Sequence, residues 1–197
     1  MRPLGRTLIA IAVLRASLGF GILLALQTRM SGTAGVCLGA FVVAQLSDHL
    51  DGWIARRWSR SSLAGYLQDS VADKLFHVGC LLGLGTVYAP VGPLLWGVLV
   101  REFVLMATRV LAPDFRVNPG RDKRYSVAYA VLLRTGILSL LLAPFAPSEG
   151  YETVAQWSGY LLTGAAVIFG WIVLALALRS PRRRERTRSQ PGEAWPH

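Results

Sequence analysis

Four aspartates lie close together in the sequence, at spacings that suit a metal site built on helices. Asp48 and Asp51 are three residues apart, and Asp69 and Asp73 are four apart. Either spacing places two carboxylates on one face of a helix. Mg²⁺ and Mn²⁺ suit all-carboxylate ligation and keep coordination positions open for phosphate oxygens. These four residues, here called the signature aspartates, therefore predict a site for one or two divalent cations.

Small and basic residues flank the signature aspartates. Gly52 and Gly65 are unfavourable inside a helix, so each indicates close approach of the backbone to another backbone or to a ligand, and Ala55 fits the same interpretation. Arg56 is suited to gripping a phosphate at the mouth of the site. Structural ion pairs, one alternative, would not need four acids, two glycines, an alanine and an arginine at these fixed spacings. A cation transport site, the other alternative, is expected nearer the membrane midplane.

The elements that carry these residues are long apolar runs. The chain has 197 residues, of which 53% are hydrophobic and 16% charged. A run of about 20 apolar residues crosses a bilayer as a helix. The sequence therefore predicts an all-α, polytopic membrane protein with six spans, at 7–27, 33–56, 64–88, 91–112, 125–143 and 154–178. The first run contains Arg15 and lacks a small-residue cleavage site, so we expect a span and not a cleaved signal peptide.

The distribution of basic residues predicts the orientation. Six spans put both termini on one side, and that side carries 15 of the 21 Lys and Arg residues, whereas the other carries Arg29 alone. The asymmetry predicts cytoplasmic termini in a cell membrane of bacterial type. Anionic lipid headgroups and phosphorylated substrates are the expected partners, and nucleic acid is not. We expect a membrane domain at 1–178 and a basic, disordered tail at 179–197.

Charged residues from five spans fall at one depth. Arg15, Glu102 and Arg134 lie with the signature aspartates within roughly 7–15 Å of the cytoplasmic boundary, at about 1.5 Å per helical residue. We expect a polar cavity open to the cytoplasm, with charges paired across it. We expect packing roles for the other notable residues of the spans, which are Cys37, His49, His77, Gly79, Cys80, Gly83 and Gly85.

The segment from Asp48 to Asp73 resembles the signature of the CDP-alcohol phosphotransferase (phosphatidyltransferase) family. Its eight defining positions are occupied at the family spacing, and Lys74 is also typical. The resemblance implies a six-helix membrane enzyme, usually a homodimer with two divalent metals. Such enzymes transfer a phosphatidyl or related group from a CDP-linked donor to an alcohol and release CMP. It also implies residue roles: Asp48, Asp51, Asp69 and Asp73 at the metals, Asp73 as general base, and Gly52, Ala55, Arg56 and Gly65 around CDP.

Two further stretches are similar to bacterial phosphatidylglycerophosphate synthases of this family. They are the Arg101-Glu102-Phe103 run followed by Arg109, and the Gly120-Arg121-Asp122-Lys123 loop. The resemblance implies that Arg101, Arg109, Arg121 and Lys123 hold the phosphate of the acceptor. Pairing with Glu102 or Asp114 is the alternative for the first two, and cytoplasmic loop charge is the alternative for the last two.

The acceptor is the least determined part of the prediction. With CDP-diacylglycerol as donor, we expect glycerol 3-phosphate first, phosphatidylglycerol (as in a cardiolipin synthase) second and an inositol phosphate third. Ser70 stands where the family usually has proline, which concerns this choice and not the metal site. A membrane metal carrier or a catalytically silent scaffold is the non-enzymatic alternative.

Overall fold

The computed structural model describes residues 3–28, 32–57, 63–111 and 119–179, with side chains described in 9–28, 32–50, 71–108, 124–176 and at 178. Helices make up almost all of these ranges, which confirms the all-α class. They are α1 (Pro3–Thr28), α2 (Thr33–Arg57), α3 (Leu63–Val87), α4 (Val91–Leu111), α5 (Pro119–Leu142), the short 3₁₀ turn η1 (Ala143–Phe145) and α6 (Glu149–Arg179).

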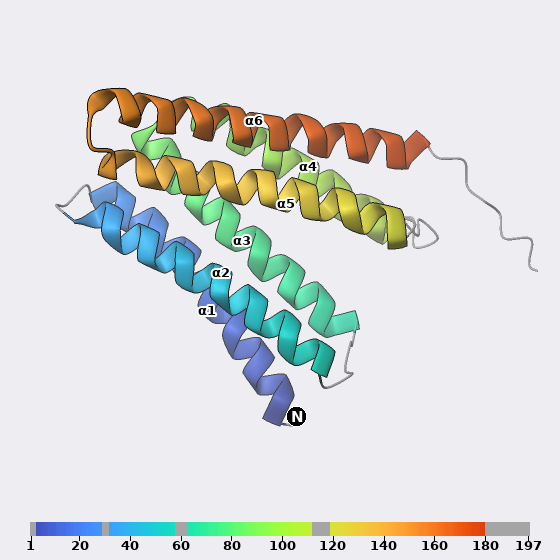
Figure 1. Ribbon diagram of the computed structural model, residues 1–197. Coiled ribbons are helices and arrows are strands. Elements are labelled where there is room, and N and C mark those ends of the chain that lie inside the picture. Colours follow the sequence, from blue (N-terminus) through green and yellow to red (C-terminus); the bar gives the residue numbers. More distant parts are fainter. Residues whose placement is uncertain (1–2, 29–31, 58–62, 112–118, 180–197) are drawn as a thin grey trace, which may run out of the picture.

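The helices form one elongated bundle (Figure 1). Helix α1 packs most extensively against α3 and also against α2, while α5 packs along α6. Helix α4 contacts α3 and α6, and α5 reaches α2 and α3. Among the described residues, the backbones of α2 and α3 approach each other little, and the two helices meet through the rings of Phe41 and Phe76. Helices α1 and α5 therefore hold α2 and α3 in place.

The predicted spans agree with the helices to within a few residues, except at two starts. Helix α5 begins at Pro119 and not at 125, and α6 begins at Glu149 and not at 154. Proline suits the first position of a helix because its missing N–H has no partner there. Glu149 and Glu152 lie in the first turn of α6, where negative charge complements the helix dipole. Both helices thus begin in polar sequence, outside the apolar stretch.

Within the described residues, five helices are long and apolar enough to cross a membrane, at Ile9–Thr28, Thr33–Leu50, Val91–Thr108, Arg124–Phe145 and Glu149–Leu176.

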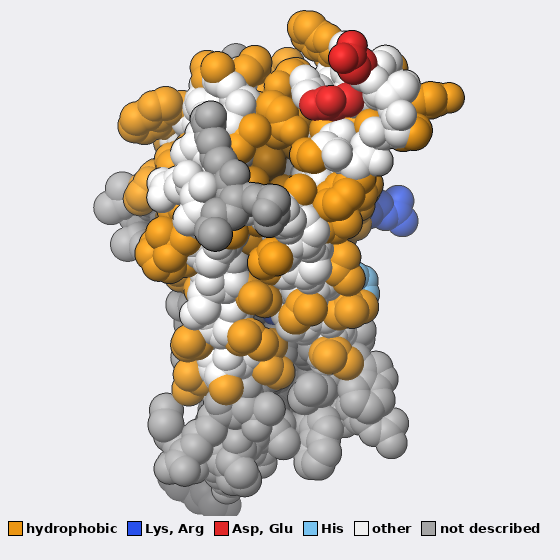
Figure 2. Space-filling view, turned by 90° about the vertical axis from the view of Figure 1, so that its left-hand side faces the viewer, with side chains coloured by type: hydrophobic (Ala, Val, Ile, Leu, Met, Phe, Trp, Pro, Cys, Tyr) orange, Lys and Arg blue, Asp and Glu red, His pale blue; other side chains and the backbone are white. Residues whose placement is uncertain are grey.

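Hydrophobic side chains cover much of the described surface in Figure 2, and large ones such as Trp96 and Phe103 are 68% and 69% exposed. Apolar exposure on this scale needs lipid or another protein to cover it. The chain is an integral membrane protein. Side chains of α3, which contains the remaining predicted span, are described only for 71–87, so the number of six spans stays a prediction.

The buried core lies where the helices meet. Cys37 and Cys80 are fully buried and form no disulfide, which confirms their packing role. Phe41 and Phe76 stack beside them with ring centroids 5.7 Å apart. His49, in contrast, is exposed, and its Nδ1 lies 2.9 Å from the Gln45 carbonyl oxygen of its own helix. His49 is therefore not part of the described core, and its packing role stays a prediction.

Close contact between α1 and α3 depends on glycine. A Cβ added to Gly79 would lie 2.5 Å from the backbone of Gly19, and one added to Gly83 would lie 3.0 Å from the Cα of Leu23. This confirms the packing role predicted for both residues of α3. Gly85 meets nothing closer than 4.0 Å, so its lack of a side chain is not required there. Small residues let membrane helices approach in this way.

We predict that Gly79→Leu destabilises the protein by at least about 1–3 kcal/mol, because the added side chain meets backbone that cannot rotate away. Gly21→Leu is the matched control on α1, since a Cβ there meets nothing within 4 Å. Unfolding of both variants in detergent measures the difference. Equal stability of the two variants would contradict the close contact.

Candidate active site

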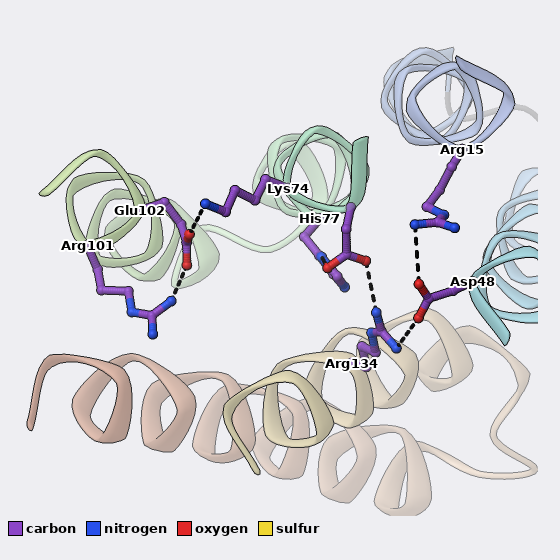
Figure 3. A network of polar contacts seen from close by, with 8 residues as sticks. Arg15, Asp48, Lys74, His77, Arg101, Glu102 and Arg134 are labelled. Carbon is purple, nitrogen blue, oxygen red and sulfur yellow. Dashed lines mark hydrogen bonds and ion pairs between the residues drawn. The ribbon is translucent and has the colours of Figure 1, made fainter. Parts of the chain in front are cut away.

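The described charges of the predicted layer come from five helices and point toward one another. Arg15 lies on α1, Asp48 on α2, Asp73 on α3, Glu102 on α4 and Arg134 on α5. In Figure 3 the charged side chains come from different helices and form two separate groups, each joined by ion pairs within the group. Pairing across the helices, as predicted from the common depth, is confirmed for these residues.

The first group, here called the bridge cluster, consists of Arg15, Asp48, Asp73 and Arg134. The Nη1 of Arg134 lies 2.8 Å from Asp48 Oδ2, and its Nη2 donates to Asp73 Oδ1 at 2.8 Å. A guanidinium is a rigid planar fork, so it can hold two carboxylates in a set geometry. Carboxylates from α2 and α3 thus meet on one side chain of α5.

The remaining oxygens of these two aspartates also face basic side chains. Arg15, whose side chain is 1% exposed, places its Nη1 3.2 Å from Asp48 Oδ1. The Nδ1 of His77 lies 3.6 Å from Asp73 Oδ2, which is beyond an ordinary hydrogen bond. His77 is buried and its ring meets that of Phe76 edge-on, which suits the packing role predicted for it.

The second group, here called the brace cluster, consists of Lys74, Glu102, Arg101 and Tyr129. Lys74 Nζ lies 2.9 Å from Glu102 Oε2, while Arg101 pairs with Glu102 Oε1. The guanidinium of Arg101 also stacks 4.1 Å from the centre of the Tyr129 ring, a favourable cation–π arrangement. Arg101 is 9% exposed, so its described contacts are internal to the bundle.

The structure thus brings together Asp48 and Asp73, the first and last of the signature aspartates, and places Arg101 in a neighbouring group. Asp51 follows Asp48 by almost one turn of α2, and Asp69 precedes Asp73 by about one turn of α3. The side chains of the other predicted site residues lie outside the described part. They are Asp51, Asp69, Gly52, Ala55, Arg56, Gly65, Arg109, Arg121 and Lys123.

The donor set fits a hard divalent cation. Asp48 and Asp73 supply carboxylate oxygens from two helices, which are the ligands that Mg²⁺ and Mn²⁺ prefer. Within the residues whose side chains are described, no group of three or more candidate ligands occurs. A fuller ligand set would need Asp51 and Asp69, which lie on the same two helices.

Two features of the site did not follow from the sequence. Arg134 was expected at the right depth and paired across the cavity, but its partners were not named, and Tyr129 was not singled out at all. Depth can be counted along each helix, whereas the pairing of α5 with α2, α3 and α4 requires the tertiary packing. An arginine nine residues inside an apolar span was the available signal for Arg134, because such a charge requires a partner.

Comparison with known proteins decides the family. A sequence profile described as CDP-alcohol phosphatidyltransferase matches residues 7–179. The chain belongs to this family. The resemblance noted between Asp48 and Asp73 is thereby confirmed. No solved structure matches the chain significantly.

Three curated relatives of this family member illustrate the range of names. A CDP-diacylglycerol–glycerol-3-phosphate 3-phosphatidyltransferase of Mycoplasma genitalium is 38% identical over 39% of this chain and 33% of its own length. A cardiolipin synthase (CMP-forming) of Streptomyces coelicolor is 34% identical over 70% of this chain and 58% of its own. A second 3-phosphatidyltransferase, from Pectobacterium atrosepticum, is 27% identical over 69% of this chain and 73% of its own. The chain therefore spans less than two thirds of the first two.

We predict that Glu102→Gln lowers the free energy of unfolding by about 3 kcal/mol, because removing one partner of a buried ion pair leaves the others uncompensated. The change keeps the shape of the side chain and removes the charge that faces Lys74 and Arg101. Glu149→Gln, at an exposed position, is the matched control. Unfolding in detergent is the measurement, and similar losses for both variants would show that the brace cluster contributes no special stability.

Proposed function

We propose that this protein transfers a phosphatidyl group from CDP-diacylglycerol to an alcohol and releases CMP, with glycerol 3-phosphate as the acceptor. The observation that carries the proposal is the meeting of Asp48 and Asp73 on Arg134, within a chain that matches the family over residues 7–179. Carboxylates gathered inside a membrane protein serve a function by default, since they are otherwise unfavourable there.

The proposed site holds one or two divalent cations, Mg²⁺ or Mn²⁺, on Asp48, Asp51, Asp69 and Asp73. When bound, such ions neutralise the charge that develops on the pyrophosphate of the donor as CMP leaves. Gly52, Ala55, Arg56 and Gly65 surround the CDP moiety in this proposal.

Asp73 accepts the proton of the attacking hydroxyl. Its Oδ1 already accepts a hydrogen bond from Arg134, so Oδ2 is the oxygen that we assign to the proton. Positioning of the two substrates and stabilisation of charge provide most of the remaining acceleration in phosphoryl transfer.

The proposed acceptor pocket uses basic residues. Because Arg101 contacts Glu102 and Tyr129 in the described structure, the assignment depends first on Arg109, Arg121 and Lys123. A phosphorylated acceptor needs several cations near the metal site. Cardiolipin synthesis, with phosphatidylglycerol as acceptor, is the second candidate, since the Streptomyces coelicolor relative of that name is 34% identical over 70% of this chain.

The proposed topology has six spans, cytoplasmic termini and a polar cavity that faces the cytoplasm. The location of 15 of the 21 basic residues on the predicted cytoplasmic side supports it. CDP-diacylglycerol would then enter from the inner leaflet with its acyl chains in lipid. We also propose a homodimer, from the resemblance to the family, and a basic tail at 179–197 that lies against anionic headgroups.

We predict that Asp73→Asn lowers CMP release by about 10²–10⁴-fold, the usual contribution of a general base. The assay uses purified protein with CDP-diacylglycerol, glycerol 3-phosphate and Mg²⁺, and EDTA should stop wild-type turnover until Mg²⁺ is restored. Unfolding and Mn²⁺ binding of the variant serve as controls. A folded variant that releases CMP at the wild-type rate would exclude Asp73 as the base.

We predict that labelled CDP-diacylglycerol yields labelled phosphatidylglycerophosphate when glycerol 3-phosphate is the acceptor. Parallel incubations with phosphatidylglycerol and with no acceptor separate the two candidates, with products resolved by thin-layer chromatography. Cardiolipin as the sole product would replace the first candidate by the second. Absence of any CMP-releasing reaction would contradict the proposed function.

A further inference from the structure

The signature aspartates are divided between two helices. Asp48 and Asp51 belong to α2, whereas Asp69 and Asp73 belong to α3. Among the described residues, the backbone of α2 approaches α1 and α5 more than α3, although an aromatic ring of α2 meets one of α3 in the core. A further link at the level of Asp48 and Asp73 would therefore help to set the separation of the two carboxylates.

Arg134 supplies the described link. Its two terminal nitrogens lie 2.8 Å from one oxygen of Asp48 and 2.8 Å from one oxygen of Asp73. The three side chains are 22%, 24% and 30% exposed, so water screens these contacts only in part. Because the guanidinium is rigid and planar, it fixes both the distance and the relative orientation of the two carboxylates. A lysine ammonium is a point charge and would not impose that geometry.

The net charge of the site also supports a role for Arg134 in holding the carboxylates together. Asp48 and Asp73 together carry −2, and Arg15 and Arg134 carry +2, so the bridge cluster is balanced by itself. When Asp51 and Asp69 are counted from the sequence, four acids and two arginines leave −2. One divalent cation would balance that charge. The arginines thus limit repulsion among the carboxylates and still leave the site attractive to a cation.

We propose that Arg134 is a positioning residue that joins the two halves of the acidic motif, so that Asp48 and Asp73 meet a divalent cation in a preset arrangement. The inference rests on the metal site of the proposed function. The second oxygen of each carboxylate is not contacted by Arg134 and faces Arg15 in Asp48 and His77 in Asp73. Groups that orient metal ligands through such hydrogen bonds typically change metal affinity by about 10–100-fold when they are removed.

The test measures Mn²⁺ binding directly, by electron paramagnetic resonance of free Mn²⁺, on the purified full-length protein without nucleotide. We expect Arg134→Gln to weaken Mn²⁺ binding by about 10–100-fold. Arg134→Lys should also weaken it by at least about fivefold, because the ammonium keeps the charge but loses the fork. Arg124→Gln is the matched control, since it removes one positive charge from an exposed position on the same helix and should bind Mn²⁺ like the wild type.

The opposite results overturn the inference. Unchanged Mn²⁺ affinity in folded Arg134→Gln would show that Arg134 has no role in positioning the ligands. Tighter binding would show that it competes with the cation. If Arg134→Gln does not fold, Arg134→Lys decides, and wild-type affinity in that variant would mean that charge alone suffices.

The outcome for the proposed function is separate. Wild-type protein that binds Mn²⁺ but releases no CMP from CDP-diacylglycerol contradicts the proposed reaction, while the comparison of variants still decides the role of Arg134. Wild-type protein that binds no Mn²⁺ overturns the inference together with the metal site.

Discussion

A charged side chain inside a membrane protein needs a counter-charge, and this requirement governs the arrangement of the bundle. Helix α3 is central because two consecutive residues, Asp73 and Lys74, pair with opposite charges on two different helices. Neighbouring residues on a helix point about 100° apart. Asp73 accordingly faces Arg134 of α5, while Lys74 faces Glu102 of α4. The bridge and brace clusters are thus linked through the peptide bond between Asp73 and Lys74.

Close helix packing makes these contacts possible. Gly19 and Gly79 bring α1 onto α3, and Gly136 and Gly159 do the same for α5 and α6, where a Cβ on Gly159 would lie 2.5 Å from Leu140 Cγ. Two tightly packed helix pairs result, and Asp73 of one pair meets Arg134 of the other where the pairs adjoin. A site at such a junction is sensitive to how the pairs sit against each other. Arg134 of α5 contacts residues of both α2 and α3, so it can influence how the two helix pairs sit at the site.

The sequence was sufficient for properties that depend on one helix at a time. Apolar runs placed the helices, and counting residues placed Arg15, Glu102 and Arg134 at one depth. The sequence did not show which charged residues pair with each other. Depth in the membrane fixes only one coordinate of a residue, whereas the rotation and the neighbours of its helix depend on packing. Arg134 was therefore expected in the layer but not between Asp48 and Asp73. The early start of α6 at Glu149 was missed because hydropathy marks the apolar stretch and not the end of the helix.

The position of Arg101 bears on what selects the acceptor. The resemblance to phosphatidylglycerophosphate synthases assigns it to the phosphate of the acceptor, whereas its described contacts are Glu102 and Tyr129. Glu102 in turn contacts Lys74, which adjoins Asp73. The Arg101-Glu102 run can therefore act on the site by holding α3 in place, without touching a substrate. In the proposed acceptor pocket, contact with the phosphate of the acceptor is then left to Arg109, Arg121 and Lys123.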